Sequence, residues 1–296
     1  MTSARTRRHQ AYWPIRLLVG KPALLRVAFL LVALLPTAAM AIPTHQLCRL
    51  DRLADCRLSA RWQQVLQSLW PGDLNQSLHH AIAGQGGVTL LADEDALILL
   101  NPEGIKRNHL VLLDETLYEQ PSLRNYRSTY YHELGHVASR HSPWLAKIQP
   151  RNWPEHWQRE VLADLYLYWH LLREGATPSE LWAQLHLRNI GLMQAQPDWQ
   201  HWTTPVLYPL LQDFTQLQRW SQRPLAQFID AALADNHSWP LHAYRRLGQR
   251  QFALTGSSVA QPYLSAPQRQ QWTAMLSPTL RWLGVDLPAY LARHQL

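Results

Sequence analysis

Apolar residues along the chain predict a short β region that is followed by a longer series of helices. The apolar segments "GVTLLAD" (87–93) and "ALILLNP" (96–102) are separated by Glu94 and Asp95, which is typical of a β-hairpin. The segment "NHLVLLDE" (108–115) has the same apolar character. It predicts a third strand, so that the three segments together form one small sheet.

From Ser122 onward, apolar residues recur at helical spacing. The predicted helices cover a histidine-containing segment described below, then about 155–174 and 178–192, and several more that Pro and Gly residues separate. This pattern predicts an α+β protein that is mainly helical. We expect residues 42–190 to form the core domain and residues 191–296 to form a helical region that completes the same fold or makes a subdomain.

The first 41 residues have the order of a secretory signal peptide. A basic stretch is followed by the apolar run "VAFLLVALL" (27–35), then Pro36, then small residues at Ala39 and Ala41. This arrangement predicts cleavage after Ala41. The alternative is an uncleaved membrane anchor, because the apolar run approaches the roughly 20 residues that a membrane span needs. The protein is expected to be periplasmic or secreted, or else anchored and facing the periplasm.

The same leader accounts for the positive net charge of +7. Six of the 28 Lys and Arg residues lie in residues 1–41, which contain no acidic residue, and this leaves 22 basic against 21 acidic residues. A nearly neutral remainder argues against a nucleic-acid partner. Contact with a membrane is expected only through the signal peptide or the uncleaved anchor.

Two cysteines, Cys48 and Cys56, follow closely after the leader. An even pair in an exported chain predicts a disulfide, because oxidising compartments favour the bridge over two free thiols. The spacing excludes a CxxC redox motif, and two cysteines alone cannot make a four-ligand zinc site.

The segment "HELGH" (132–136) carries the chemistry of a catalytic metal site. On a helix, His132 and His136 lie one turn apart on a single face, where one zinc ion can bind both rings. Glu133, beside the first ligand, can act as a general base on water. Leu134 is predicted to face the core, and Gly135 to allow close packing against a supporting element.

Two histidines leave the site incomplete, because catalytic zinc normally has three protein ligands and one open position. In the metzincin pattern the third ligand is a His six residues after the second, but this residue is Ser142, which excludes that class. His141 lies about 140° around an ideal helix from His136. We therefore interpret His141 as a residue at the helix end, or one that supports a ligand, rather than a ligand itself.

The predicted third ligand is Glu160, in "EVLAD". Asp164 follows on the same helix face and can accept a hydrogen bond from the free ring nitrogen of a ligand histidine. Such a pair of like charges is unfavourable without a cation or a donor between its members. Glu155 is a rival ligand, but it follows Pro154 as a residue of the first helical turn and has no acidic residue four positions later.

"HELGH" followed by "EVLAD" resembles the gluzincin metallopeptidases. The longer strings "HELGHVASRH" and "REVLADLYLYWHLLREGATPSEL" resemble those of CAAX-prenyl-protease type zinc peptidases and their soluble periplasmic relatives. The resemblance covers roughly residues 120–250 and implies a zincin-like domain, one Zn²⁺ per chain and a peptide or protein substrate. It also implies that the strand in 109–115 is the sheet edge along which an extended peptide lies.

In this family a later segment approaches the active site, and 235–247 resembles it loosely without the usual His-Pro dipeptide. By resemblance, the candidates for stabilising the oxyanion or binding substrate are His237, His242, Tyr244 and Arg245, with Tyr208 as a further candidate.

These observations favour a zinc-dependent peptidase of the cell envelope with Glu133 as general base. The alternative class is a non-catalytic, zinc-stabilised envelope scaffold or assembly factor that keeps a protease-like fold. A nucleic-acid-linked regulator is disfavoured by the export signal and by the charge distribution.

Overall fold

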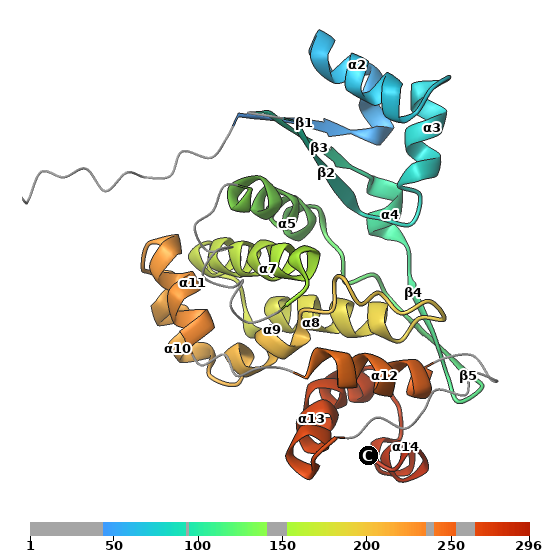
Figure 1. Cartoon of the computed structure of the whole chain (residues 1–296), viewed down its shortest axis with the longest axis vertical. Coiled ribbons are helices and arrows are strands. Elements are labelled where there is room, and N and C mark those ends of the chain that lie inside the picture. Colours follow the sequence, from blue (N-terminus) through green and yellow to red (C-terminus); the bar gives the residue numbers. More distant parts are fainter. Residues whose placement is uncertain (1–43, 93–94, 141–152, 235–239, 253–263) are drawn as a thin grey trace, which may run out of the picture. The chain divides into compact units, whose positions relative to one another are not determined.

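The computed structural model describes residues 44–92, 95–140, 153–234, 240–252 and 264–296. Contacts divide the chain into Met1–Ala41 and Ile42–Leu296, and every described residue belongs to the second unit. The predicted leader therefore lies outside the described residues. Within them, many helices accompany two small sheets, which confirms the predicted mainly helical α+β class (Figure 1).

The larger sheet has three strands in the order β1-β3-β2. The predicted hairpin is confirmed, because β2 (Gly87–Ala92) pairs antiparallel with β3 (Asp95–Leu100). On the other side of β3 lies β1 (His45–Arg49), which runs parallel to it. The sheet therefore has β2 as one of its edges.

The segment 108–115 does form a strand, but the prediction that this strand joins the sheet of β2 and β3 is wrong. Its strand, β4 (His109–Leu113), pairs with β5 (Thr116–Gln120) in a separate two-stranded sheet. The connecting residues Asp114 and Glu115 both have positive φ, 47° and 67°, as the tightest hairpin turns require. The local pairing of β4 with the next few residues thus replaces the predicted pairing with β3.

The apolar run of β3 is explained by burial on both faces of the sheet. Leu97 and Leu99 pack with the 3-10 helix η1 (Leu50–Asp55), α2 (Ala60–Leu69) and α3 (Leu74–Ala81). Ala96, Ile98 and Leu100 pack instead with Leu134 and Val137 of α5. The sheet thus lies between α2 and α3 on one side and α5 on the other (Figure 1).

The predicted Cys48–Cys56 disulfide is present, with Cα atoms 5.7 Å apart. It joins β1 to the end of η1. The bridge therefore fixes the start of the described chain to the sheet.

Two adjacent helices follow, α5 (Tyr126–Ser139) and α7 (Glu155–Arg173). Asn125 caps α5 by accepting a hydrogen bond from the Ser128 backbone N–H, and the Ser128 hydroxyl completes the capping box. A Cβ atom at Gly135 would lie only 2.6 Å from the Cα of Ala163. The absence of a side chain at Gly135 therefore lets α5 and α7 approach closely, as the sequence predicted.

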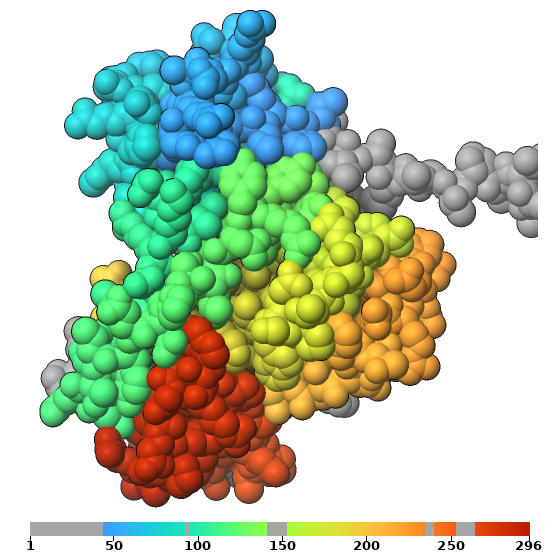
Figure 2. Space-filling view, turned by 180° about the vertical axis from the view of Figure 1, so that it is seen from behind, coloured from blue at the N-terminus to red at the C-terminus, as the bar shows by residue number. Residues whose placement is uncertain are grey.

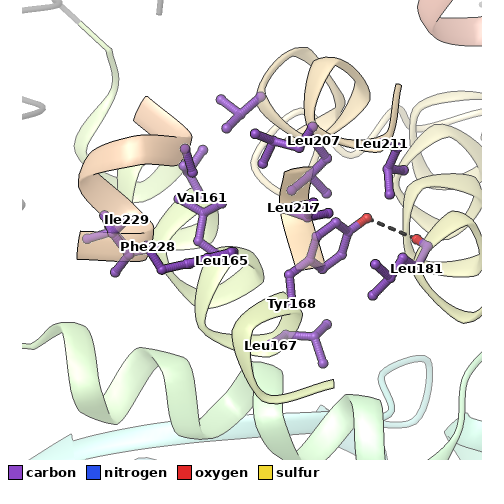
Figure 3. Packing of buried hydrophobic residues seen from close by; sticks show 14 of the residues in the cluster. Val161, Leu165, Leu167, Tyr168, Leu181, Leu207, Leu211, Leu217, Phe228 and Ile229 are labelled. Carbon is purple, nitrogen blue, oxygen red and sulfur yellow. Dashed lines mark hydrogen bonds between the residues drawn. The ribbon is translucent and has the colours of Figure 1, made fainter. Parts of the chain in front are cut away.

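The helix predicted over 178–192 is α8 (Pro178–Leu192), which begins with a capping box between Thr177 and Glu180. With α7 it packs against α9 (Thr204–Leu211), α10 (Phe214–Ser221) and α11 (Leu225–Ala234) in the core shown in Figure 3. In that core the Tyr168 hydroxyl donates a hydrogen bond of 2.9 Å to the Leu181 carbonyl. The helices after residue 191 therefore share a core with those before it.

A second core surrounds the fully buried Trp202 and Trp272. It is built by the last helices, α12 (Leu241–Phe252), α13 (Ala266–Leu283) and α14 (Leu287–His294). The β4–β5 hairpin also contributes to it and lies beside α13 (Figure 2). The short helix α4 (Pro102–Lys106) connects β3 to this hairpin. None of the described helices has both the length and the apolar character that crossing a membrane requires.

Candidate metal centre

Helices α5 and α7 place three metal-ligating side chains together: His132, His136 and Glu160. One candidate ligand atom from each lies within 4.8 Å of the other two. The Nε2 atoms of His132 and His136 are 3.2 and 3.5 Å from the carboxylate oxygens of Glu160. The structure therefore brings together the three residues that the sequence spacing selects as ligands.

The donor set fits a divalent metal. The Glu160 side chain is only 12 % exposed, and its buried Oε2 atom makes no hydrogen bond although it lies near His132. A buried carboxylate oxygen without a hydrogen bond is costly unless a cation compensates it. Two imidazole nitrogens and one carboxylate oxygen, with a fourth position left open, are the donors of a catalytic zinc site.

Asp164 holds the ring of His132 in position. Its Oδ1 atom lies 2.9 Å from His132 Nδ1, which is the contact predicted from the spacing of Glu160 and Asp164 along the helix. With Nδ1–H donating to this carboxylate, the Nε2 lone pair of His132 is free to face a metal.

Asp164 is itself completely buried and is held by two residues that the sequence did not reveal. Arg188 of α8 donates to both of its carboxylate oxygens, including one bond of 2.9 Å from Nε to Oδ2. The Thr203 hydroxyl also donates to Oδ2. The carboxylate therefore links α5, α7, α8 and the start of α9.

The charges of the cluster follow from these contacts. Burial raises the pKa of Asp164, but Arg188 and His132 outweigh this effect and hold the pKa well below its ordinary value. Burial also raises the pKa of Glu160, yet contacts with His132 and His136 lower it to about 2. Both carboxylates are therefore ionised at neutral pH, as metal binding requires.

The two histidines differ in their protonation. Burial and the charge of Arg188 lower the pKa of His132, but its contacts with the carboxylates of Asp164 and Glu160 prevail and raise it to about 9. Burial lowers the pKa of His136, with Glu160 acting in the opposite direction. A metal that binds here at neutral pH must therefore displace a proton from His132.

Glu133 is buried next to the cluster but is not one of its three ligands. The Thr89 hydroxyl of β2 lies 2.8 Å from Glu133 Oε2 and 3.0 Å from the Glu133 backbone oxygen. A Cβ atom at Gly87 would approach Glu133 Cγ to 3.1 Å, so this part of β2 leaves room for the carboxylate. Strand β2 thus fixes the predicted base, which is a role that the sequence alone did not assign to Thr89.

Both His132 and Glu133 line a cleft of about 530 Å³. Its walls come from Gly84–Gly87, from the segment around β4, from the first half of α5, from the second half of α8 and from the loop that contains Asp198 and His201. A cleft of this size beside a candidate metal centre has the dimensions of a ligand-binding site.

His201 and Asp198 approach the centre from the loop between α8 and α9. Asp198 Oδ2 lies 2.7 Å from His201 Nδ1, and His201 Nε2 lies 3.5 Å from Glu160 Oε1. Neither residue was among the candidates predicted from the sequence. The Asp-x-x-His spacing was the available signal, but only the fold brings the pair to the cluster.

The described candidates of the segment 235–247 are His242, Tyr244 and Arg245, and none of the three lines this cleft. Tyr244 is buried between Trp202 and Trp272, and its hydroxyl lies 3.0 Å from Gln271 Oε1. His242 and Arg245 are exposed on α12, and among the described residues neither lines the cleft. They lie away from the cleft because α12 packs on α13 around Trp272.

The remaining candidates are placed as follows. Tyr208 packs between the two helical cores and faces Trp182, and it does not line the cleft. Glu155 is exposed and pairs with Arg159 at the start of α7. His141 and His237 lie outside the described residues.

Comparisons of the chain with protein-family models, with curated proteins and with solved structures found no match. The chemistry of the centre therefore has to follow from its residues and geometry.

Proposed function

We propose that the protein is a zinc-dependent peptidase with a zincin-like catalytic domain. His132, His136 and Glu160 hold one Zn²⁺, and Glu133 is the general base. The observation that carries this proposal is the convergence of the three ligand atoms from α5 and α7 beside a buried Glu133 in an open cleft. The resemblance of "HELGH" and "EVLAD" to gluzincins supports the same assignment.

Each side chain has a defined task in this proposal. When bound, Zn²⁺ supplies a Lewis acid that polarises the scissile carbonyl and acidifies water. Glu133, held by Thr89, accepts a proton from the attacking water and returns it to the leaving amine. Asp164 keeps the ring of His132 oriented so that Nε2 faces the metal.

An extended peptide is proposed to lie along β2. The sheet edge beside α5 is β2, whereas β4, which the resemblance assigned to this role, belongs to a separate hairpin. Gly87, the first residue of β2, and Gly86 before it line the cleft together with Glu133. Backbone hydrogen bonds to an edge strand hold peptides without requiring a particular side chain.

The proposal is tested by metal analysis together with a cleavage assay. We expect the purified protein to contain about one zinc per chain and to hydrolyse an unfolded protein such as casein, with loss of hydrolysis after chelation and recovery on adding zinc. A metal-loaded protein that cleaves nothing would contradict the peptidase and favour the non-catalytic scaffold.

Glu160→Ala is expected to lower zinc affinity by at least about 100-fold, because one of three ligands is lost and the two histidines alone bind weakly. Competition with a chromophoric chelator measures the affinity. Glu155→Ala is the matched control, since Glu155 is an exposed glutamate of the same helix. Unchanged zinc affinity in Glu160→Ala would place the third ligand elsewhere.

His201 is proposed to stabilise the oxyanion. Asp198 holds its Nδ1 atom, so that Nε2 faces Glu160, and in the protonated ring both nitrogens donate hydrogen bonds. His201→Ala is expected to lower kcat by about 100-fold with little change in KM, because the bond forms only as charge develops. Zinc content should stay constant, since His201 is outside the ligand cluster.

Steady-state kinetics and zinc content measure this effect, with His156→Ala as a control on an exposed histidine. A fall in zinc content together with kcat would make His201 a residue that supports the metal rather than the oxyanion.

The cell envelope is the proposed location. The Cys48–Cys56 disulfide supports an oxidising compartment, and the leader sequence supports export.

A further inference from the structure

Arg124 occupies a fixed position in the wall of the cleft, just before α5. Its Nη1 atom donates a hydrogen bond of 3.2 Å to the Gly84 carbonyl on the other wall. The adjoining residues are also held, because the Ser122 hydroxyl donates to the Ile105 carbonyl and the Leu123 N–H donates to His109 Nε2. The Gly84 carbonyl therefore positions the guanidinium, and hydrogen bonds of Ser122 and Leu123 hold the backbone that carries it.

The cleft contains other charged groups, and two of those closest to Arg124 already have partners, whereas Arg107 lies exposed at the cleft wall. Arg188 is bound to Asp164, and Asp198 is paired with His201. His109 adds no positive charge, because its Nε2 atom accepts a backbone hydrogen bond, and burial with the nearby charge of Arg124 lowers its pKa to about 4. The charge of Asp198 acts on Arg124 from beyond ion-pair distance, so Arg124 forms no ion pair with a described residue of the cleft wall.

Arg124 itself is half-buried, and within the described part of the chain no carboxylate lies at ion-pair distance from it. One guanidinium N–H is used by Gly84, out of the five that arginine can donate. The remaining N–H groups can bind both oxygens of a carboxylate, which is the geometry that guanidinium groups favour. Beside Gly84 there is open space, since a Cβ atom there would meet no atom within 4 Å.

We propose that Arg124 binds a carboxylate of the peptide substrate, in the same cleft that holds His132 and Glu133. This inference rests on the proposed peptidase function and specifies the substrate class. The carboxylate comes either from the C-terminus of the peptide or from an acidic side chain, and both present the same two oxygens to the guanidinium.

The test uses three pools of mixed-sequence hexapeptides with the zinc-loaded protein. One pool has free C-termini without Asp or Glu, a second has amidated C-termini with Asp and Glu, and a third is amidated and lacks both. Cleavage is followed by mass spectrometry for the unaltered protein, Arg124→Gln and Arg124→Lys. Arg127→Gln is the matched control, because it removes the same charge three residues later and Arg127 does not line the cleft.

We expect one of the first two pools to be cleaved about 10-fold faster or more than the third, as the loss of a charged hydrogen-bonded partner implies. The faster pool identifies the source of the carboxylate. Arg124→Gln should abolish this preference, Arg124→Lys should keep part of it, and Arg127→Gln should keep all of it. Equal rates for the three pools, or a preference that survives in Arg124→Gln, would overturn the inference.

If no pool is cleaved, the peptidase proposal fails, and the carboxylate site is then tested by peptide binding alone. Fluorescence polarisation then compares fluorescein-labelled versions of the same pools. Tighter binding of a carboxylate-containing pool that Arg124→Gln removes would support the site. Equal affinities of the three pools for the unaltered protein would overturn it.

Discussion

Glu133→Gln is expected to abolish peptide hydrolysis while zinc stays bound. Gln has nearly the same shape as Glu, and its amide oxygen can still accept the hydrogen bond of the Thr89 hydroxyl, so the cleft should keep its structure. What is lost is the capacity to take a proton from water. Positioned acid–base groups contribute about 10²- to 10⁴-fold, and we expect kcat to fall by about 10³-fold or more.

Kinetics on a cleavable peptide and zinc content of the same sample measure this prediction. Glu174→Gln is a suitable control, because Glu174 is bonded by Tyr131 and Arg127 at the end of α7 and does not line the cleft. Undiminished activity in Glu133→Gln would contradict the proposed role of Glu133 as general base. Loss of zinc would instead give Glu133 a role in holding the metal.

Asp164→Ala is expected to destabilise the protein strongly. The substitution leaves the Arg188 guanidinium buried without its carboxylate, and it leaves His132 Nδ1 and the Thr203 hydroxyl without their acceptor. Breaking a buried ion pair by removing one partner costs about 3 to 5 kcal/mol of unfolding free energy. Urea unfolding of the metal-free protein measures the change.

The double variant Asp164→Ala with Arg188→Met separates the two roles of Asp164. Removing both charges should restore much of the stability, since an apolar pair avoids the desolvation of the arginine. Zinc affinity should remain about 10- to 100-fold weaker, because His132 still lacks its orienting partner. If Asp164→Ala were as stable as the unaltered protein, the ion pair of Asp164 and Arg188 would not contribute to stability as proposed.

The parts of the structure that the sequence predicted depend on local patterns. The β2–β3 hairpin follows from apolar segments that adjoin in the chain, and α7 and α8 follow from helical spacing with a capping box at Thr177. The ligand set could also be predicted from local spacing. His132 and His136 lie one turn apart on one helix, and Glu160 and Asp164 lie one turn apart on the next.

The parts that the sequence did not predict depend on contacts between distant segments. Strand β1 is too short and too mixed in character to stand out, and only its parallel pairing with β3 makes it a strand. Arg188 resembles any arginine on an amphipathic helix until α8 packs beside Asp164. The candidates on α12 lie outside the cleft, because a loose resemblance cannot show which face of a helix enters a core.

The contact between Gly135 and Ala163 determines how far apart the candidate ligands of the two helices lie. Because Gly135 has no side chain, the backbones of α5 and α7 are in direct contact there. The resulting distance between the helices fixes the separation of the two histidines from Glu160. A side chain at Gly135 would push the two helices apart and widen the separation of His132 and His136 from Glu160. The spacing of the three candidate ligands thus depends on a glycine that is not one of them.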